Sequence, residues 1–476
     1  DPKGTLVKEY GQTFIDKGYD LKILDLNNMD NSMRYNPYHY CKSATDIMKF
    51  LNNLMENTKD PNKTGGDEFW DKAGLTLLMA LSFLIMGTDY PQNQNIPRIM
   101  DLLDMMEAAE DDDSKMSVMD FVFQELQEEV NAKLQSGDPK LVLSCKNSYQ
   151  YLACRQYSLF KKAAGKTAKS ILITLSSRLS VFNLPQLNDL LSKDELHLET
   201  IGNPKIRKGK ESVPDSDPEK YIKTALFICI SDSDSTFSFL AAIIYQQLFD
   251  LLYKQADIRP LGALPIPVQF ILDEFANTGK ILDFEKKIST VRSRNIFVFI
   301  LLQALSQLKF MYQNDVWETI YGNCDTTIFL GGKEFTTLEY LSKNIGNTTI
   351  DYMSIQETKG ANGSWSRSNQ LIQRQLLPPD EIKRLKPNEC LIDVRGHYIY
   401  RDCKYNLTHH SHYNMTADAD QSKYLNPYHY IKEQREAHQL DAGWEMDPAN
   451  YADYLEDMDI IDVSQEEMEL YLREVS

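Results

Sequence analysis

Apolar runs of strand length alternate with stretches of helical periodicity along most of the chain, and this alternation limits the possible folds more than any other feature. Polar or glycine-rich turns follow the runs, and a helical pattern follows each turn. This order predicts an α/β fold with a mostly parallel sheet. The expected strands are Leu21–Leu26, Leu226–Ile230, Val268–Leu272, Ile296–Leu302 and Thr327–Leu330.

A second kind of region, between about residues 66 and 165, contains no convincing strand. Phe69–Met86 is apolar nearly all round, which is typical of a helix at the centre of a helical cluster. Helical spacing continues in Asp101–Ala109 and Met116–Leu134. We therefore expect an all-helical domain inserted into the α/β domain. The predicted divisions are 1–65 and 166–412 for the two parts of the α/β domain, 66–165 for the inserted domain and 413–476 for an acidic tail.

The composition, 42% hydrophobic and 25% charged over 476 residues, is ordinary for a soluble globular protein. The longest apolar stretch, Leu75–Met86, predicts a buried helix, because a membrane span needs roughly 20 apolar residues. The seven cysteines show no C-x-x-C spacing and indicate buried free thiols in a reducing compartment. The densest histidine group, His409-His410-x-His412, is interpreted as a solvated loop in preference to a metal site.

The net charge of −18 at first argues against a nucleic-acid partner. From Asp441 to Ser476, however, twelve residues are acidic and one is basic, so most of the excess belongs to the tail. The charge of the remaining chain is mild and does not exclude a nucleic-acid-binding surface of limited extent. Aromatic residues among the tail acids fit either a segment that binds a basic partner or a disordered solubilising tail.

The most informative motif for chemistry is Val268–Asn277, an apolar run that ends in Asp273-Glu274. This is the Walker B pattern, because ligands bind outside the carboxyl ends of parallel strands and two acids placed there face the phosphates. In this interpretation Asp273 holds Mg²⁺ through water, and Glu274 orients and polarises the attacking water. The alternative is a buried strand whose acids only stabilise the start of the next helix.

Two groups further along the chain favour nucleotide chemistry. Gln303 ends the run Phe297–Leu302, and an amide at the end of the strand beside Walker B senses the γ-phosphate in oligomeric RecA-like motors. Arg292 precedes this strand, and an arginine from the neighbouring subunit stabilises the charge that develops on the γ-phosphate. Arg292 alone fits a solvated helix residue equally well, but the order and spacing of these groups together favour hydrolysis.

Several motifs closely resemble the TraG/TraD-like coupling proteins of type IV secretion, in the right order over roughly residues 1–410. The resemblance implies a membrane-tethered hexameric ATPase with a RecA-like domain and an inserted all-helical domain. It implies ATP and Mg²⁺ as cofactors and the roles given above for Asp273, Glu274, Gln303 and Arg292. The motifs are Asp1-Pro2-Lys3-Gly4, Leu272–Asn277, Thr290–Arg294, Leu302–Leu308, Gly322–Asp325, Phe329–Gly332 and Leu376–Ile382.

The chain departs from this family at the phosphate-binding loop. Its one Gly-Lys-Thr, at residues 165–167, follows a predicted helix and has Phe160 where a Walker A motif needs glycine. In the family, the P-loop strand and the membrane helices precede Asp-Pro-Lys-Gly, so we expect them upstream of Asp1. The strand that ends at Gln303 is then expected to have an open apolar edge. We expect the chain alone not to hydrolyse ATP appreciably, whereas the parent protein does.

Two polar segments are candidates for contact with DNA. Lys208 lies among four basic residues in the glycine- and proline-containing stretch 202–219. Trp365 and Arg367 lie in 357–375, which is interpreted as flexible, and an aromatic beside an arginine can stack on and neutralise single-stranded DNA. Both compositions are also common in ordinary surface loops.

The resemblance implies the soluble part of a hexameric motor at the cytoplasmic face of the bacterial membrane, tethered through an N-terminal segment outside this chain. Such a motor recruits the relaxase–DNA complex with accessory proteins and pumps single-stranded DNA to the secretion channel. The main alternative is a non-hydrolysing adaptor that binds relaxase through the helical domain and the tail. A double-strand DNA translocase of chromosome segregation is a third candidate, although its C-terminal winged helix is replaced here by an acidic tail.

Overall fold

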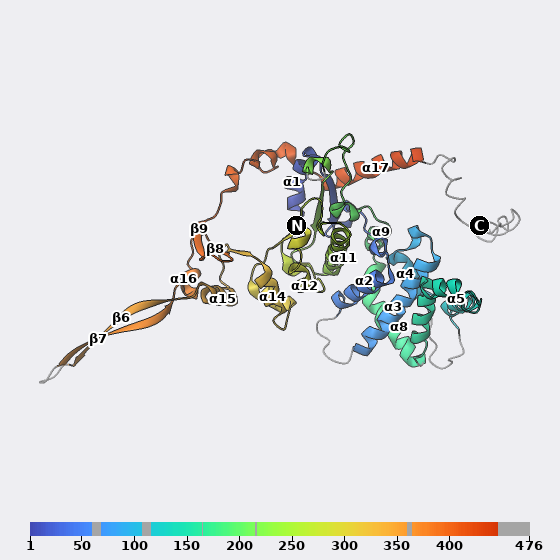
Figure 1. Cartoon of the computed structure of the whole chain (residues 1–476), viewed down its shortest axis with the longest axis horizontal. Coiled ribbons are helices and arrows are strands. Elements are labelled where there is room, and N and C mark those ends of the chain that lie inside the picture. Colours follow the sequence, from blue (N-terminus) through green and yellow to red (C-terminus); the bar gives the residue numbers. More distant parts are fainter. Residues whose placement is uncertain (60–67, 107–115, 164, 215–216, 359–363, 446–476) are drawn as a thin grey trace. The chain divides into compact units, whose positions relative to one another are not determined.

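The computed structural model describes residues 1–59, 68–106, 116–163, 165–214, 217–358 and 364–445 (Figure 1). The chain divides into two compact units, residues 1–425 and 426–476. In the second unit the described residues form one helix, α17 (Pro427–Glu445). Residues 446–476 of the acidic tail lie outside the described residues, and so do the tail aromatics Tyr451, Tyr454 and Tyr471.

Two pairs of parallel strands form the core of the α/β part. β1 (Asp20–Asp25) pairs with β2 (Thr224–Cys229), and β3 (Val268–Leu272) pairs with β4 (Ile296–Ile300). The register aligns the first residues of β3 and β4, so their carboxyl ends meet at the same edge. Together with β5 (Thr326–Phe329), these strands are the five that the sequence predicts.

Helices pack on these strands from the segments that connect them. α1 (Thr5–Asp16) packs against β1. α11 (Ser238–Asp257) is apolar over most of its circumference and is therefore buried along most of its length. It covers one face of β3, where the rings of Phe249 and Phe270 stack with centroids 4.2 Å apart.

In the described residues, helices and loops but no strand connect β1 to β2, as expected for an inserted helical domain. The central helix, α3 (Glu68–Thr88), packs against α2, α4, α7 and α8. Ser43 caps α2, because its Oγ accepts a hydrogen bond from the Asp46 N–H at 3.2 Å. The domain limits given above stay a prediction. The other helices of this part are α2 (Ala44–Asn57), α4 (Ile96–Asp104), α5 (Val118–Leu134), α6 (Pro139–Lys146), α7 (Tyr149–Phe160), α8 (Gly165–Leu179) and α9 (Pro185–Leu190). The short helix α10 (Glu199–Gly202) follows them and packs against α11 of the α/β part.

α3 is longer than the apolar stretch Leu75–Met86 on which the prediction of a buried helix rested. Within the described residues it is the one helix that is long and apolar enough to cross a membrane, and half of its apolar window is buried by its neighbours. Ala80, Leu81 and Ile85 are fully buried in the cluster. A core helix surrounded by other helices meets the same criteria of length and composition.

A second, antiparallel sheet has the order β5–β8–β9, with β8 at Glu389–Val394 and β9 at Tyr400–Cys403. Its small core contains Leu338 and Leu341 of α15 (Phe335–Ile345). Ile382 of α16 (Pro379–Ile382) and Leu391 of β8 complete this core.

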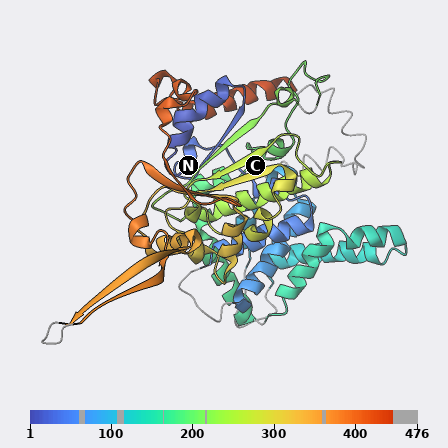
Figure 2. The same ribbon diagram turned by 60° about the vertical axis from the view of Figure 1, so that its left-hand side comes forward.

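A long hairpin leaves this region between α15 and α16. β6 (Asn347–Thr358) pairs with β7 (Ser364–Gln375) in an unbroken antiparallel register, and Figure 2 shows the two strands side by side. The interpretation of 357–375 as flexible is therefore wrong for its larger part. The reason is that serine, asparagine and glutamine side chains occupy much of both faces, so β7 lacks the apolar–polar alternation of a half-buried strand.

Short helices complete the first unit, and its thiols are free. All seven cysteines are free and five of them are buried, as the sequence predicts. The remaining helices are α12 (Phe284–Ile288), α13 (Leu305–Met311) and α14 (Val316–Asn323).

Candidate nucleotide site

Asp273 and Glu274 directly follow the last residue of β3, and both side chains are half-buried. Glu274 has a φ of 51°, in the left-handed region that a residue with a Cβ adopts at a cost. The next residue, Phe275, is fully buried beside Phe284 and Tyr312, with ring centroids 5.1 and 6.1 Å away. This aromatic anchor fixes the turn, so the two acids are presented at the carboxyl edge of the strand.

Gln303 is the residue that contacts Glu274. Its Nε2 donates hydrogen bonds to both carboxylate oxygens of Glu274, at 2.9 and 3.0 Å. The two residues come from the carboxyl ends of neighbouring strands, which is the placement expected for a catalytic carboxylate and a sensor amide. A bidentate contact of this kind holds the carboxylate in one orientation.

Gln303 is itself positioned by the start of α13. The side-chain oxygen of Gln307 accepts hydrogen bonds from the N–H groups of Gln303 and Ala304, at 3.0 and 3.2 Å. The Thr337 hydroxyl accepts a third bond from the N–H of Leu305 at 2.9 Å. The sequence analysis missed these positioning roles. The spacing Gln303-x-x-x-Gln307 at a strand–helix junction is the signal for the first, whereas Thr337 is too distant in sequence to be found.

Arg292 does not lie near Glu274 and Gln303 of its own chain. It begins the short turn Arg292–Arg294, which precedes β4, and so it lies at the amino end of a strand whose carboxyl end leads to Gln303. Its side chain is exposed. The neighbouring Arg294, by contrast, forms an ion pair with Asp257, whose Oδ1 is 2.9 Å from the guanidinium. The guanidinium carbon also lies 4.3 Å from the ring centroid of Tyr253.

The carboxyl ends of β1 and β2 border an open cleft of about 430 Å³. Lys3, Asp232 and Asn277 are among its lining residues, and Asn277 belongs to the turn that follows Glu274. Burial, with a smaller contribution from the charge of Asp25, raises the pKa of Cys229, at the end of β2, to about 12. The thiol therefore stays protonated near neutral pH and is not a nucleophile.

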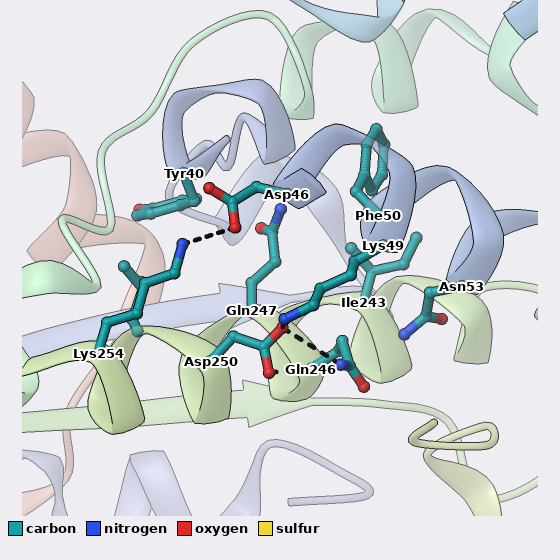
Figure 3. Close-up of a pocket in the computed structure, with 11 residues that line it drawn as sticks. Tyr40, Asp46, Lys49, Phe50, Asn53, Ile243, Gln246, Gln247, Asp250 and Lys254 are labelled. Carbon is teal, nitrogen blue, oxygen red and sulfur yellow. Dashed lines mark hydrogen bonds and ion pairs between the residues drawn. The ribbon is translucent and has the colours of Figure 1, made fainter. Parts of the chain in front are cut away.

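A smaller pocket between α2 and α11, shown in Figure 3, is a packing seam. Its free volume of about 20 Å³ holds about one water molecule, far too little for a nucleotide. Ion pairs cross it, from Lys254 to Asp46 at 2.6 Å and from Lys49 to Asp250 at 3.3 Å. Burial opposes ionisation of Asp46, but the hydrogen bonds from Lys254 and Ser43 prevail and lower its pKa.

The three candidate DNA contacts lie on two separate elements. Trp365 and Arg367 are two residues apart on β7 and therefore share one face of the hairpin, where both are exposed. Lys208 is also exposed, on the loop that a single bridge between Ile206 and Tyr221 closes. The Gly-Lys-Thr at 165–167 begins α8 and follows the helix α7, so it lacks the strand that a P-loop requires.

The face of β3 and β4 opposite α11 carries exposed apolar side chains. Ile271 is 64% exposed and Phe299, its partner in the register, is 53% exposed. Phe297 and Leu301 continue this surface along β4 at 43% each. Within the described residues β4 pairs only with β3, which leaves its other edge open, as expected for the strand that ends at Gln303.

Comparison with known proteins decides the family. The model of the family described as "Type IV secretory system Conjugative DNA transfer" matches residues 1–398. The chain belongs to this family. Over 180 residues it is 27% identical to Protein VirD4 of Agrobacterium fabrum, and over 227 residues it is 27% identical to the conjugal transfer protein TraG of Escherichia coli. These matches cover 37% and 45% of this chain but only 26% and 33% of the relatives' own lengths.

Solved structures of the conjugative coupling protein TrwB share the fold. The unbound form, TrwBdeltaN70, has a TM-score of 0.52 at 14% identity, and the match covers 85% of this chain and 77% of that one. TrwB in complex with the non-hydrolysable GTP analogue GDPNP has a TM-score of 0.51 at 14% identity. The predicted fold is thereby confirmed: the type IV coupling protein chain has a RecA-like P-loop NTPase fold with an inserted all-helical domain.

Proposed function

We propose that this chain supplies part of an ATP hydrolysis site in a conjugative DNA-pumping motor, namely the residues that position the attacking water and the Mg²⁺ ion. The contact of Gln303 with both carboxylate oxygens of Glu274 carries the proposal. In it, Glu274 orients and polarises the attacking water, and Gln303 links the carboxylate to the state of the γ-phosphate. Asp273 holds Mg²⁺ through water, and the ion supplies positive charge against the phosphates.

The phosphate cradle has to come from elsewhere in the working protein, because these 476 residues contain no G-x-x-x-x-G-K-[ST]. The open edge of β4 and its exposed face, with Phe297, Phe299 and Ile271, support this idea. A strand–P-loop–helix unit presents an edge to pair with β4 and a helix to cover the apolar face. The same unit brings backbone N–H groups to the side of the site opposite Glu274.

Assembly as a ring explains the position of Arg292. At the amino end of β4 it is too far from Glu274 of its own chain to touch the same phosphate. In a head-to-tail ring each subunit presents one surface to the site of its neighbour, so an exposed arginine reaches a second site without moving within its own chain. We propose a hexamer in which Arg292 acts on the adjacent nucleotide.

The proposed cargo pathway uses exposed residues outside the nucleotide site. The shared face of Trp365 and Arg367 offers a ring for stacking and a charge for phosphate, and Lys208 offers a second charge. Relaxase and accessory proteins are the proposed protein partners, and the secretion channel receives the DNA. The protein would act at the cytoplasmic face of the bacterial membrane.

The test is single-stranded-DNA-stimulated ATP hydrolysis by the complete gene product that contains this chain. We expect stimulated turnover in the unmodified protein and a loss of about 10²-fold or more in Glu274→Gln. Glu318→Gln on α14, where the side chain is exposed, is the matched control and should keep full turnover.

A different outcome would favour the alternative. If the complete product binds relaxase but turns over no ATP with or without DNA, the protein is a recruitment adaptor and the motor proposal fails. Turnover that survives Glu274→Gln would show that hydrolysis occurs with another base, and the assignment of Glu274 would be wrong.

A further inference from the structure

Two connectors join the α/β part to the helical part, and they run side by side. The outgoing connector, residues 26–43, follows β1, and the returning connector, residues 191–198, precedes α10. The N–H of Tyr35 donates to the Leu190 carbonyl at 2.8 Å. Arg34 and Glu195 exchange two bonds of 2.9 Å, from the Arg34 N–H to the Glu195 carboxylate and from the Glu195 N–H to the Arg34 carbonyl.

Three metal-ligating side chains meet on this seam. His39 comes from the outgoing connector, His197 from the returning connector, and Glu199 is the first residue of α10; we call these three the connector site. One ligating atom of each lies within 4.8 Å of the other two. Nδ1 of His197 is 3.5 Å from Oε1 of Glu199, and both side chains are nearly half exposed. Small rotations of exposed side chains therefore suffice to close the triangle around an ion.

A buried carboxylate and a hydroxyl support the site from behind. Asp194, whose side chain is 3% exposed, accepts hydrogen bonds at Oδ2 from the Tyr40 hydroxyl at 2.7 Å and from the His197 N–H at 2.9 Å. The same oxygen is 4.0 Å from Nδ1 of His197. Through its bond from the His197 N–H, Asp194 fixes the backbone that carries this imidazole. His197 has a φ of 50°, so these contacts hold its backbone in a conformation that is unfavourable in isolation.

Glu199 supplies an independent indication that a cation belongs here. Within the described part of the chain, Oε2 of Glu199 is buried and has no hydrogen-bond partner. A buried carboxylate oxygen without a partner is costly, and such atoms call for an explanation by a bound ion or water. A cation held by the Glu199 carboxylate would give this oxygen a partner.

We propose that His39, His197 and Glu199 bind one divalent ion of the zinc class and so clip the two connectors together. Two imidazole nitrogens and one carboxylate are a ligand set of open zinc sites, in which water takes the fourth position. Mg²⁺ and Ca²⁺ are disfavoured because they prefer all-oxygen ligands. The ion would stiffen the link between the helical part and the α/β part.

Metal titration of this chain tests the proposal. The protein is stripped with a chelator, and Zn²⁺ is added at neutral pH in competition with a chromogenic chelator. We expect one tight equivalent, weakened by about 10- to 100-fold in His197→Asn and in Glu199→Gln. The control removes the surface histidines of the other cluster, with His409, His410 and His412 all changed to Asn, and should retain the tight equivalent.

Amide hydrogen exchange and the Zn²⁺ affinities of the variants together decide whether the connector site binds the ion. Zn²⁺ should slow amide hydrogen exchange in residues 34–40 and 194–200 of the unmodified chain and not in His39→Asn. Equal Zn²⁺ affinity in all variants, or loss only in the triple variant, would mean an adventitious ion only and would overturn the proposal. Since His39 is peripheral to the Tyr40–Asp194 contact, His39→Asn remains informative if His197→Asn does not fold.

Discussion

At the scale of single residues, the backbone of Glu274 adopts a conformation that is costly for a residue with a Cβ. Its φ of 51° suits glycine better than any residue with a Cβ. We predict that the free energy of unfolding of Glu274→Gly exceeds that of Glu274→Ala by about 1 kcal/mol, measured by urea denaturation. At Glu318 in α14 the order reverses, because glycine is the poorer residue inside a helix. If Glu274→Ala were as stable as Glu274→Gly or more stable, the backbone of residue 274 would not be strained.

Gln303 allows a second residue-scale prediction, since its amide is the group that holds the Glu274 carboxylate. In the complete gene product, Gln303→Ala should lower DNA-stimulated turnover on the order of 10²-fold, while nucleotide affinity changes much less. The reason is that the amide orients the carboxylate and leaves the phosphate cradle untouched. Gln313→Ala, at an exposed position in the same region, serves as control. A loss of affinity as large as the loss of turnover would mean that Gln303 binds the ground state.

Sequence reasoning brought these residues together because their placement follows from local order. Asp273 and Glu274 end an apolar run, and Gln303 ends the next one, so a parallel sheet alone predicts that they meet. The connector site is different, because His39 and His197 are far apart in sequence and neither stands in a ligand spacing. Only the pairing of the two connectors brings them together, and that pairing depends on hydrogen bonds that have no sequence pattern.

At the scale of elements, Asp120 ties two helices of the inserted part. Its carboxylate accepts hydrogen bonds from the Ser117 N–H at 2.8 Å and the Tyr157 hydroxyl at 2.7 Å, and pairs with Lys161 at 2.9 Å. Burial opposes ionisation, yet these partners prevail and lower the pKa of Asp120 to about 2. We predict that Asp120→Asn lowers the free energy of unfolding by about 2 kcal/mol at neutral pH.

The pH dependence of that difference has a definite sign. A carboxyl whose folded pKa lies below its unfolded value contributes its full stability above the unfolded pKa, near 4, and loses it as the pH falls towards 2. The urea midpoints of wild type and Asp120→Asn should therefore differ by a constant amount from pH 7 to about 5 and converge below about 4. Asp104→Asn, exposed on α4, should show no such difference at any pH.

The β6–β7 hairpin carries the DNA-contact prediction. Its strands contain as many acidic as basic residues, so electrostatic attraction to DNA is weak and stacking has to supply most of the affinity. We predict that Trp365→Ala weakens single-stranded DNA binding by about 1–3 kcal/mol, and that Arg367→Ala reduces the salt slope by about one. Tyr352→Ala, on the other face of the hairpin, is the control. Unchanged binding in both variants would remove the hairpin from the DNA path.

The elements also show why prediction from sequence succeeded for the parallel strands β1 to β4 and failed for the hairpin β6–β7. β1 to β4 are mainly apolar, with Lys22 and Gln269 as the polar residues in their interiors, since they lie in or near the core of a parallel arrangement. Such runs are visible in sequence. β6 and β7 gain most of their order from their own ladder, and in the described residues most of both strands is exposed beyond the base of the hairpin, where β7 contacts α15. Without a buried face, a strand has no apolar alternation, and the sequence alone suggests a loop.

At the scale of the whole molecule, the question is whether a site is made by one chain or by two. Arg292 and Glu274 lie at opposite ends of the paired strands β3 and β4, which are five residues long, so about 16 Å of strand separates the levels at which they emerge. A guanidinium at that distance cannot stabilise charge on a phosphate held at Glu274. In the ring proposed above, the arginine of one subunit would lie against the acids of the next.

Mixing two inactive variants of the complete gene product distinguishes these arrangements. Glu274→Gln keeps Arg292, and Arg292→Ala keeps Glu274, so each variant alone lacks one group at every site. In an equimolar mixed ring with shared sites, about a quarter of the interfaces join an intact Glu274 to an intact Arg292. We therefore expect DNA-stimulated turnover in the mixture to approach about a quarter of the wild-type rate, well above either variant. If Arg292 acted within its own chain, every subunit would remain defective and mixing would restore nothing.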